Sequence, residues 1–176
     1  MSGKKKQAKE DMLPFITKDE IAKLVMFLAK TIETDYEGRE VILICPLRGS
    51  IHFLADLCRQ IQLPQQVDFV QLQAVEKGGA IKIIKDISTN IAGKHVLIVE
   101  EIIDTGRTLS FLRNRLMASS PASLKIVALL DKPARRELPI RPDYVGRTID
   151  DRYVVGYGMD SSEMGRNYPD IYVMKN

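Results

Sequence analysis

Residues 96–109 read VLIVEEIIDTGRTL: four apolar residues lead into Glu100 and Glu101, and two more precede Asp-Thr-Gly-Arg-Thr. The apolar run at 94–99 predicts a buried strand, and the periodic pattern of 106–119 predicts a helix after a short turn. Short apolar strands that alternate with helices form βαβ units with a parallel sheet. Because such sheets bind ligands beyond the carboxyl ends of their strands, we expect the polar residues of this stretch at a functional edge.

The turn from Asp104 to Thr108 has the residue types that a phosphate group requires. Gly106 permits a tight turn. The free N–H groups of the first helical turn, together with the hydroxyls of Thr105 and Thr108, favour an anion. The turn is not a Walker P-loop, because the sequence has no G-x-x-x-x-G-K-[ST] pattern. A helix start capped by Asp104 or Thr105 is the alternative interpretation.

Glu100 and Glu101 favour the phosphate-binding interpretation. As an exposed pair they would need no special explanation, but adjacent carboxylates are costly to bury without partners. Beside a phosphate site they can accept hydrogen bonds from sugar hydroxyls, and their field favours positive charge developing on a sugar ring. A diol and a phosphate on one molecule describe a phosphoribosyl group.

The rest of the chain continues the alternation of helices and strands. Thr17 and Glu20 have capping-box spacing ahead of a helical pattern. Helices are predicted at 17–32 and 50–60, and strands at 40–45, 66–72, 80–87 and 123–131, with strand-like pieces from 143 onward. Together they predict a single α/β domain whose parallel sheet is flanked by helices.

The composition is that of an ordinary globular protein. The 176 residues are 45% hydrophobic and 28% charged, and a net charge of +3 is too small to argue for nucleic acid. The opening MSGKKKQAKE is expected to be a disordered basic tail. No signal-peptide or membrane-spanning pattern occurs, and Cys45 and Cys58 lack disulfide spacing, so we expect a cytoplasmic protein.

The stretch at 96–109 resembles the phosphoribosyl-pyrophosphate (PRPP) signature of the type I phosphoribosyltransferases. PLRGS (46–50), LLDKPARRE (129–137) and YVVGYGMDSSEMGRNYPDIYV (153–173) look like the hypoxanthine-guanine branch of that family. The resemblance implies that residues 11–176 form one phosphoribosyltransferase domain after the tail at 1–10. It also implies a core at about 38–140 and a small hood from 11–37 and 141–176.

The resemblance implies a role for each matching residue. Asp104 would be the acid/base partner of purine N7. The 5′-phosphate would be held by Asp104, Thr105, Gly106, Arg107 and Thr108. The ribose hydroxyls would be held by Glu100 and Glu101, directly or through Mg²⁺. The pyrophosphate would be held by Leu47, Arg48, Gly49, Ser50 and Arg166, with a candidate cis peptide at Leu47–Arg48. The purine would be held by Lys132, Tyr153 and Val154, and Asp160 would be a further Mg²⁺ ligand beside Glu100 and Glu101.

The activity implied by the resemblance is purine salvage. The 5-phosphoribosyl group of PRPP would move to hypoxanthine or guanine, giving IMP or GMP and pyrophosphate. Lys132 offers only hydrogen-bond donors, which favours 6-oxopurines over adenine. The family further implies Mg²⁺ as cofactor and a homodimer or homotetramer, and we expect no membrane or nucleic-acid partner. The alternatives are a xanthine-preferring enzyme, an RNA-binding regulator on the same fold, and a non-catalytic regulatory paralogue.

Two departures from the family pattern are visible in the sequence. The family usually has Glu-Asp where this chain has Glu100-Glu101. The loop that usually carries a Ser-Tyr pair reads LQAVEKGGAIKI (72–83), in which Gly78-Gly79 predict a flexible lid that excludes water.

Overall fold

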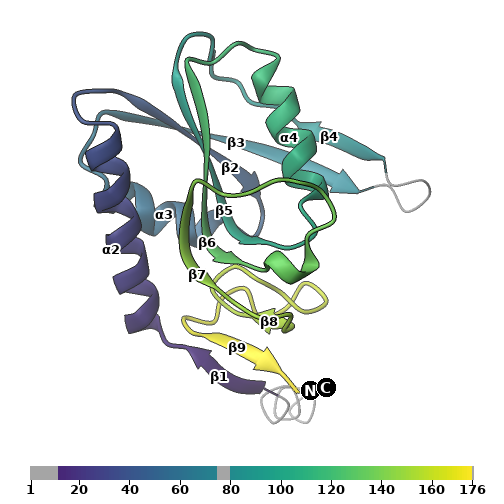
Figure 1. Ribbon diagram of the computed structural model, residues 1–176. Helices are drawn as coiled ribbons and strands as arrows, with labels where there is room; N and C mark the ends of the chain where they lie inside the picture. Colours follow the sequence, from purple (N-terminus) through teal and green to yellow (C-terminus); the bar gives the residue numbers. More distant parts are fainter. Residues whose placement is uncertain (1–11, 75–79, 176) are drawn as a thin grey trace.

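A six-stranded sheet forms the centre of the protein, seen here in a computed structural model that describes residues 12–74 and 80–175 (Figure 1). The strand order is β4-β3-β2-β5-β6-β7. Neighbours pair in parallel except at the edge, where β4 is antiparallel to β3. The strands are β2 (Val41–Leu47), β3 (Gln65–Ala74), β4 (Ile81–Lys85), β5 (His95–Ile103), β6 (Ser123–Asp131) and β7 (Tyr144–Thr148). The predicted α/β fold with a parallel sheet flanked by helices is confirmed, except that the edge strand β4 is antiparallel.

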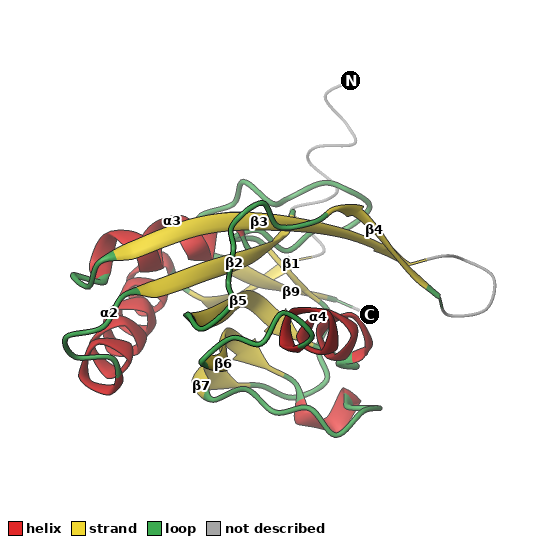
Figure 2. Ribbon diagram, turned by 90° about the horizontal axis from the view of Figure 1, so that it is seen from above, coloured by secondary structure: helices red, strands yellow, loops and turns green. Residues whose placement is uncertain are grey.

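Helices cover both faces of this sheet, because its central strands are apolar on both sides. Alternate residues of β5 point to opposite faces of the sheet and join different clusters of buried hydrophobic residues. Leu97 packs with α2 (Lys18–Asp35) and α3 (Ile51–Gln60), whereas Ile98 packs with α4 (Arg107–Met117). Figure 2 shows α2 and α3 on one side of the strands and α4 on the other. A short 3-10 helix, η1 (Pro133–Arg135), follows β6.

A second sheet forms the hood. It has the order β1-β9-β8, with β1 (Met12–Ile16) and β8 (Val154–Val155) both antiparallel to β9 (Ile171–Met174). Two elements expected in the hood lie in the core instead, because α2 buries its apolar face against the main sheet and β7 extends that sheet beside β6. The expected tail at 1–10 and Gly78-Gly79 lie outside the described residues.

Local sequence signals account for most element boundaries. The capping box is present at the start of α2, where Thr17 Oγ1 accepts from the backbone N–H of Glu20 at 3.3 Å and the Thr17 N–H donates to Glu20 Oε2 at 2.9 Å. Two predicted strand ends were too early. The strand predicted at 40–45 continues through Pro46. At Pro46 β2 no longer pairs with β5, so the missing proline N–H removes no hydrogen bond between these two strands. The strand at 94–99 continues to Ile103, so Glu100 and Glu101 belong to β5 itself.

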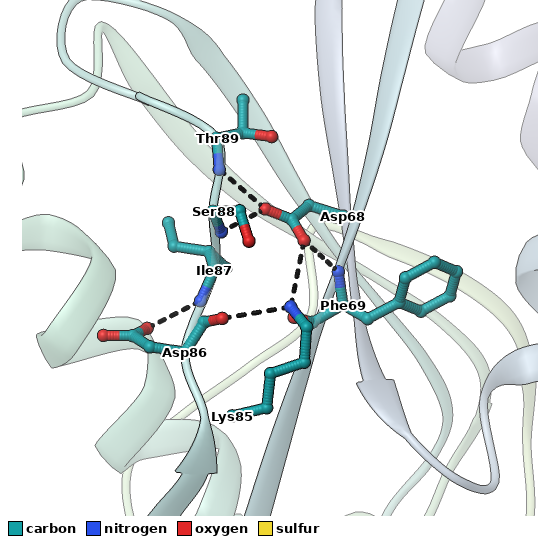
Figure 3. Close-up of polar contacts among 7 residues, drawn as sticks. All are labelled: Asp68, Phe69, Lys85, Asp86, Ile87, Ser88 and Thr89. Carbon is teal, nitrogen blue, oxygen red and sulfur yellow. Dashed lines mark hydrogen bonds and ion pairs between the residues drawn. The ribbon is translucent and has the colours of Figure 1, made fainter.

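A buried aspartate fixes the return of the chain from the β3–β4 hairpin (Figure 3). Asp68, 7% exposed, accepts hydrogen bonds from the backbone N–H groups of Phe69 at 2.7 Å, Ser88 at 2.6 Å and Thr89 at 2.8 Å. Lys85 Nζ lies 3.3 Å from the same carboxylate. Burial alone would raise the pKa of Asp68, but the hydrogen bonds from the Thr89, Phe69 and Ser88 N–H groups lower it to about 2.

Asp68→Asn is therefore expected to lower the free energy of unfolding by about 2 kcal/mol near pH 7, because an amide cannot serve three N–H donors as a carboxylate does. The folded pKa of about 2 lies below the ordinary value of 3.8, so this contribution is present above pH 4 and declines as the pH falls through 2. Denaturant unfolding of both proteins at pH 7 and at pH 2 to 3 measures it. Asp150→Asn is the control, since its carboxylate is 85% exposed. A wild-type advantage that does not shrink with acid would contradict the assignment.

Candidate functional site

Two adjoining cavities open beyond the carboxyl ends of the parallel strands, the edge at which parallel sheets bind ligands. The first, of about 310 Å³, is lined by the loop after β2, the acidic end of β5, the turn 104–108 and Arg166. The second, of about 180 Å³, is lined by residues that include Lys132, Tyr153 and Asp160. Both contain Glu101 and Asp104. After the ligands that the family resemblance implies for their lining residues, we call them the sugar-phosphate cavity and the base cavity.

The turn in the sugar-phosphate cavity ends at a glycine with a left-handed backbone. Gly106 is the N-cap residue of α4, with φ +82°, and as a glycine it has no side chain to make a capping hydrogen bond. Neither Asp104 nor Thr105 is the N-cap residue, although Thr105 Oγ1 accepts a hydrogen bond from the backbone N–H of Arg107 at 3.4 Å. A Cβ at Gly106 would lie 2.5 Å from Ile140 Cγ2, so a larger residue does not fit. The residues of the first helical turn line the cavity, where the N–H dipoles of a helix start favour an anion.

The acidic pair at the end of β5 is held by the loop after β2. Ser50 is fully buried, and its Oγ donates to Glu100 Oε2 at 3.1 Å and to Glu101 Oε2. The backbone N–H of Glu101 donates to Ser50 Oγ at 3.2 Å. Burial raises the pKa of both glutamates, and the neighbouring Glu101 charge raises that of Glu100 further. Two carboxylates in this setting favour a cation.

The loop after β2 packs closely against both the acidic pair and the hood. The Leu47–Arg48 peptide is cis, as expected. A Cβ at Gly49 would lie 1.8 Å from Glu101 Oε1, and one at Gly158 would lie 1.9 Å from the Gly49 oxygen. Position 158 therefore requires glycine, whereas a Cβ at Gly49 would have to displace the Glu101 carboxylate, which occupies that space.

The base cavity combines a buried lysine with an exposed aromatic ring. Lys132 is 6% exposed and lines the cavity, and its side chain makes no hydrogen bond or ion pair within the described residues. Tyr153 is 53% exposed, and its hydroxyl donates to the Asp160 carbonyl at 3.1 Å. Val154 is buried and pairs with Val173 of β9, which fixes the backbone at the cavity. The cavity thus offers a donor, a ring face and backbone groups to a flat heterocycle.

Sequence reasoning did not single out the two arginines that contact Asp104. Nε of Arg135 donates to Asp104 Oδ1 at 3.0 Å, and the guanidinium of Arg136 donates to the Asp104 carbonyl and pairs with Asp131. Both arginines belong to DKPARRE, which follows β6 as DTGRT follows β5. The sequence feature that could have identified these arginines is that the turns after two neighbouring parallel strands lie side by side.

All predicted site residues lie at these two cavities or directly beside them. Arg166 connects them to the hood: its guanidinium pairs with Asp160 Oδ1 at 2.7 Å and donates to the Gly158 carbonyl at 2.8 Å. Across residues 12–74 and 80–175, no three His, Cys, Asp or Glu side chains form a metal site by themselves. A metal at Glu100 and Glu101 would therefore need oxygen ligands from a bound molecule as well. No helix in the described part of the chain is long and apolar enough to cross a membrane.

A parallel sheet with a phosphate-binding turn, an acidic strand end and a small hood defines the type I phosphoribosyltransferase fold. The family model of the phosphoribosyl transferase domain matches residues 16–162, and the chain belongs to that family. It is 43% identical over 170 residues to the hypoxanthine phosphoribosyltransferase of Salmonella typhimurium, covering 93% of this chain and 94% of that protein. A crystal structure of a hypoxanthine-guanine phosphoribosyltransferase from Bacillus anthracis superposes with a TM-score of 0.89 at 41% identity, covering 93% of this chain and 97% of the other.

Some relatives are much longer. The bifunctional protein TilS/HprT of Listeria monocytogenes is 38% identical over 164 residues, which are 91% of this chain and 25% of that protein. The chain thus spans about a quarter of the length of these bifunctional relatives.

Proposed function

We propose that the protein transfers the 5-phosphoribosyl group of PRPP to hypoxanthine or guanine, giving IMP or GMP and pyrophosphate. The observation that carries the proposal is the pair of adjoining cavities that share Glu101 and Asp104. One suits a sugar phosphate and the other a flat base, so their junction is where a bond between sugar carbon and ring nitrogen would form. The family membership and the names of the relatives support the same reaction.

The sugar-phosphate cavity would orient PRPP through its 5′-phosphate and its ribose hydroxyls. The backbone and hydroxyls of Thr105 to Thr108 would hold the 5′-phosphate at the start of α4. Glu100 and Glu101 would accept hydrogen bonds from the ribose hydroxyls, and their negative charge would favour the oxocarbenium-like sugar. Because Ser50 contacts both carboxylates, the loop after β2 would position the acidic pair as well as the leaving group.

The leaving pyrophosphate would be held by the loop 47–50 and Arg166. Arg48 and Arg166 add fixed positive charge and paired donors. The donor set also fits Mg²⁺, a hard cation that prefers carboxylate and phosphate oxygens, with Glu100, Glu101 and Asp160 as the protein ligands. When bound, the metal would supply positive charge to the pyrophosphate.

The base cavity would hold the purine beside Asp104. Tyr153 would stack on the ring, the Val154 backbone would contact its edge, and Lys132 would donate to a 6-oxo group. Asp104 would take the proton from N7 as the new bond forms at the other ring nitrogen. The pair with Arg135 holds its carboxylate beside the cavity.

We propose a homodimer or homotetramer in the cytoplasm, with residues 11–176 as one domain. Cys45 and Cys58 are free thiols, which is consistent with a reducing compartment.

Incubation of the protein with Mg²⁺, PRPP and each of hypoxanthine, guanine, xanthine and adenine tests the function directly. We expect nucleotide and pyrophosphate in equal amounts with hypoxanthine or guanine. Product only with xanthine would favour the xanthine-preferring alternative. No product, combined with salt-dependent retention on RNA, would favour the RNA-binding alternative.

Gly49→Ala should lower kcat/KM for PRPP by about two orders of magnitude, because the added Cβ displaces the Glu101 carboxylate. Adding Glu101→Asp to Gly49→Ala should recover part of this loss, because the shorter acid leaves room for the methyl group. Steady-state kinetics on the three proteins measure both effects. A fully active Gly49→Ala enzyme would show that the close contact between these two residues has no functional role.

A further inference from the structure

Glu163, in the hood loop between β8 and β9, places one carboxylate oxygen between the two arginines assigned to pyrophosphate. Its Oε2 accepts from Arg48 Nη1 at 2.8 Å and lies 3.3 Å from Arg166 Nη2. Arg48 belongs to the loop after β2, so this contact joins the core to the hood. None of the roles assigned above uses Glu163.

The backbone of the hood loop aims the Glu163 side chain at this pair. Ser162 and Glu163 have φ values of +50° and +65°, a left-handed conformation that residues other than glycine adopt at a cost. Backbone hydrogen bonds between Ser161 and Met164, at 2.9 and 3.0 Å, close the turn. The N–H of Glu163 donates to Asp160 Oδ2 at 2.8 Å, so the turn is tied to the same aspartate that pairs with Arg166.

The contact lies at the edge of the sugar-phosphate cavity. Arg48 and Arg166 line that cavity, and both also line a neighbouring cavity of about 420 Å³ that includes Glu163. Guanidinium groups bind carboxylate and phosphate oxygens through the same charge-assisted hydrogen bonds. The side chains of Arg48 and Glu163 are 64% and 61% exposed, so water screens their attraction and the pair can exchange. A pyrophosphate group, with more charge and more oxygens, would compete with this carboxylate for both arginines.

We infer that the Glu163 carboxylate is a placeholder for pyrophosphate: it binds Arg48 and Arg166 until PRPP or pyrophosphate takes its place. This role rests on the proposed function. Before PRPP binds, its carboxylate holds Arg48 and Arg166 near each other and offsets their mutual repulsion. Pyrophosphate, free or as part of PRPP, displaces it from both arginines. The displacement opposes binding, so Glu163 lowers the affinity for the product pyrophosphate and helps it leave.

Glu163→Gln tests this inference, because it keeps the size of the side chain and removes the charge. Calorimetric titration with magnesium pyrophosphate should give a Kd about two- to fivefold lower than in the wild type, the range expected for an exposed ion pair. The inhibition constant for pyrophosphate in the forward reaction should fall by the same factor. Asp150→Asn, which removes an exposed hood carboxylate paired with Arg152, should leave both constants unchanged. When Arg48 is already replaced by Ala, Glu163→Gln should lower the Kd for magnesium pyrophosphate by a smaller factor. The reason is that only one of the two arginines for which Glu163 and pyrophosphate compete is then left.

The outcomes separate this inference from the proposed function. If wild-type protein binds magnesium pyrophosphate but Glu163→Gln binds it equally or more weakly, Glu163 supports the loop structurally and the placeholder role is wrong. If wild-type protein binds neither magnesium pyrophosphate nor PRPP, the proposed function itself is contradicted. Thermal unfolding of each variant shows whether a weaker Kd comes from a damaged fold.

Discussion

Asp104→Asn should lower kcat by about two to four orders of magnitude while PRPP affinity stays within a few-fold of wild type. Asparagine has nearly the shape of aspartate but cannot accept and keep the N7 proton. The side chain is well placed for that step, because Asp104 lines both cavities and its Oδ1 is held at 3.0 Å by Arg135. Single-turnover kinetics with hypoxanthine, together with direct titration of PRPP, measure chemistry and binding separately.

Asp151→Asn is the matched control for this experiment. Asp151 also pairs with Arg135, at 3.6 Å, but it lines neither cavity. Its replacement should therefore change kcat little. If Asp104→Asn loses PRPP binding and kcat to the same extent, Asp104 serves to bind the sugar phosphate and the acid/base role fails.

Lys132→Met should reduce the preference for hypoxanthine over adenine by about two to four orders of magnitude in kcat/KM. The Lys132 ammonium group would meet a 6-oxo acceptor in hypoxanthine, whereas the 6-amino group of adenine would leave two donors facing each other. Methionine keeps the apolar stem and removes the charge, so most of the loss should fall on hypoxanthine. Competition between the two bases in one reaction measures the ratio.

Lys94→Met is the corresponding control. Lys94 lies at the opposite end of the sheet, just before β5, and pairs with Glu40 at 3.7 Å. Its loss should leave selectivity unchanged. An unaltered hypoxanthine preference in Lys132→Met would instead show that backbone groups alone recognise the base.

Local patterns were sufficient to predict most of the helices and strands and the turns that carry many of the candidate site residues. The capping box at Thr17 and the apolar periodicity of α2 depend on residues within a turn or two, so they can be read from a short window. The glycine of DTGRT predicted a tight turn, and Gly106 has the left-handed backbone that such a turn requires. Strand β1 was missed, because MLPFI is short, contains proline and pairs only with a segment at the other end of the chain.

The sequence by itself determined the α/β alternation, the strand that carries Glu100 and Glu101, and the turn after it, because each depends on neighbours along the chain. Only the tertiary structure decided which distant groups meet: Ser50 with Glu101, Arg135 with Asp104, and Arg48 with Glu163. It also decided that α2 and β7 belong to the core. The physical reason is that these contacts depend on strand order and on the packing of the hood. A local pattern records which face of an element is apolar, but not which element will cover it.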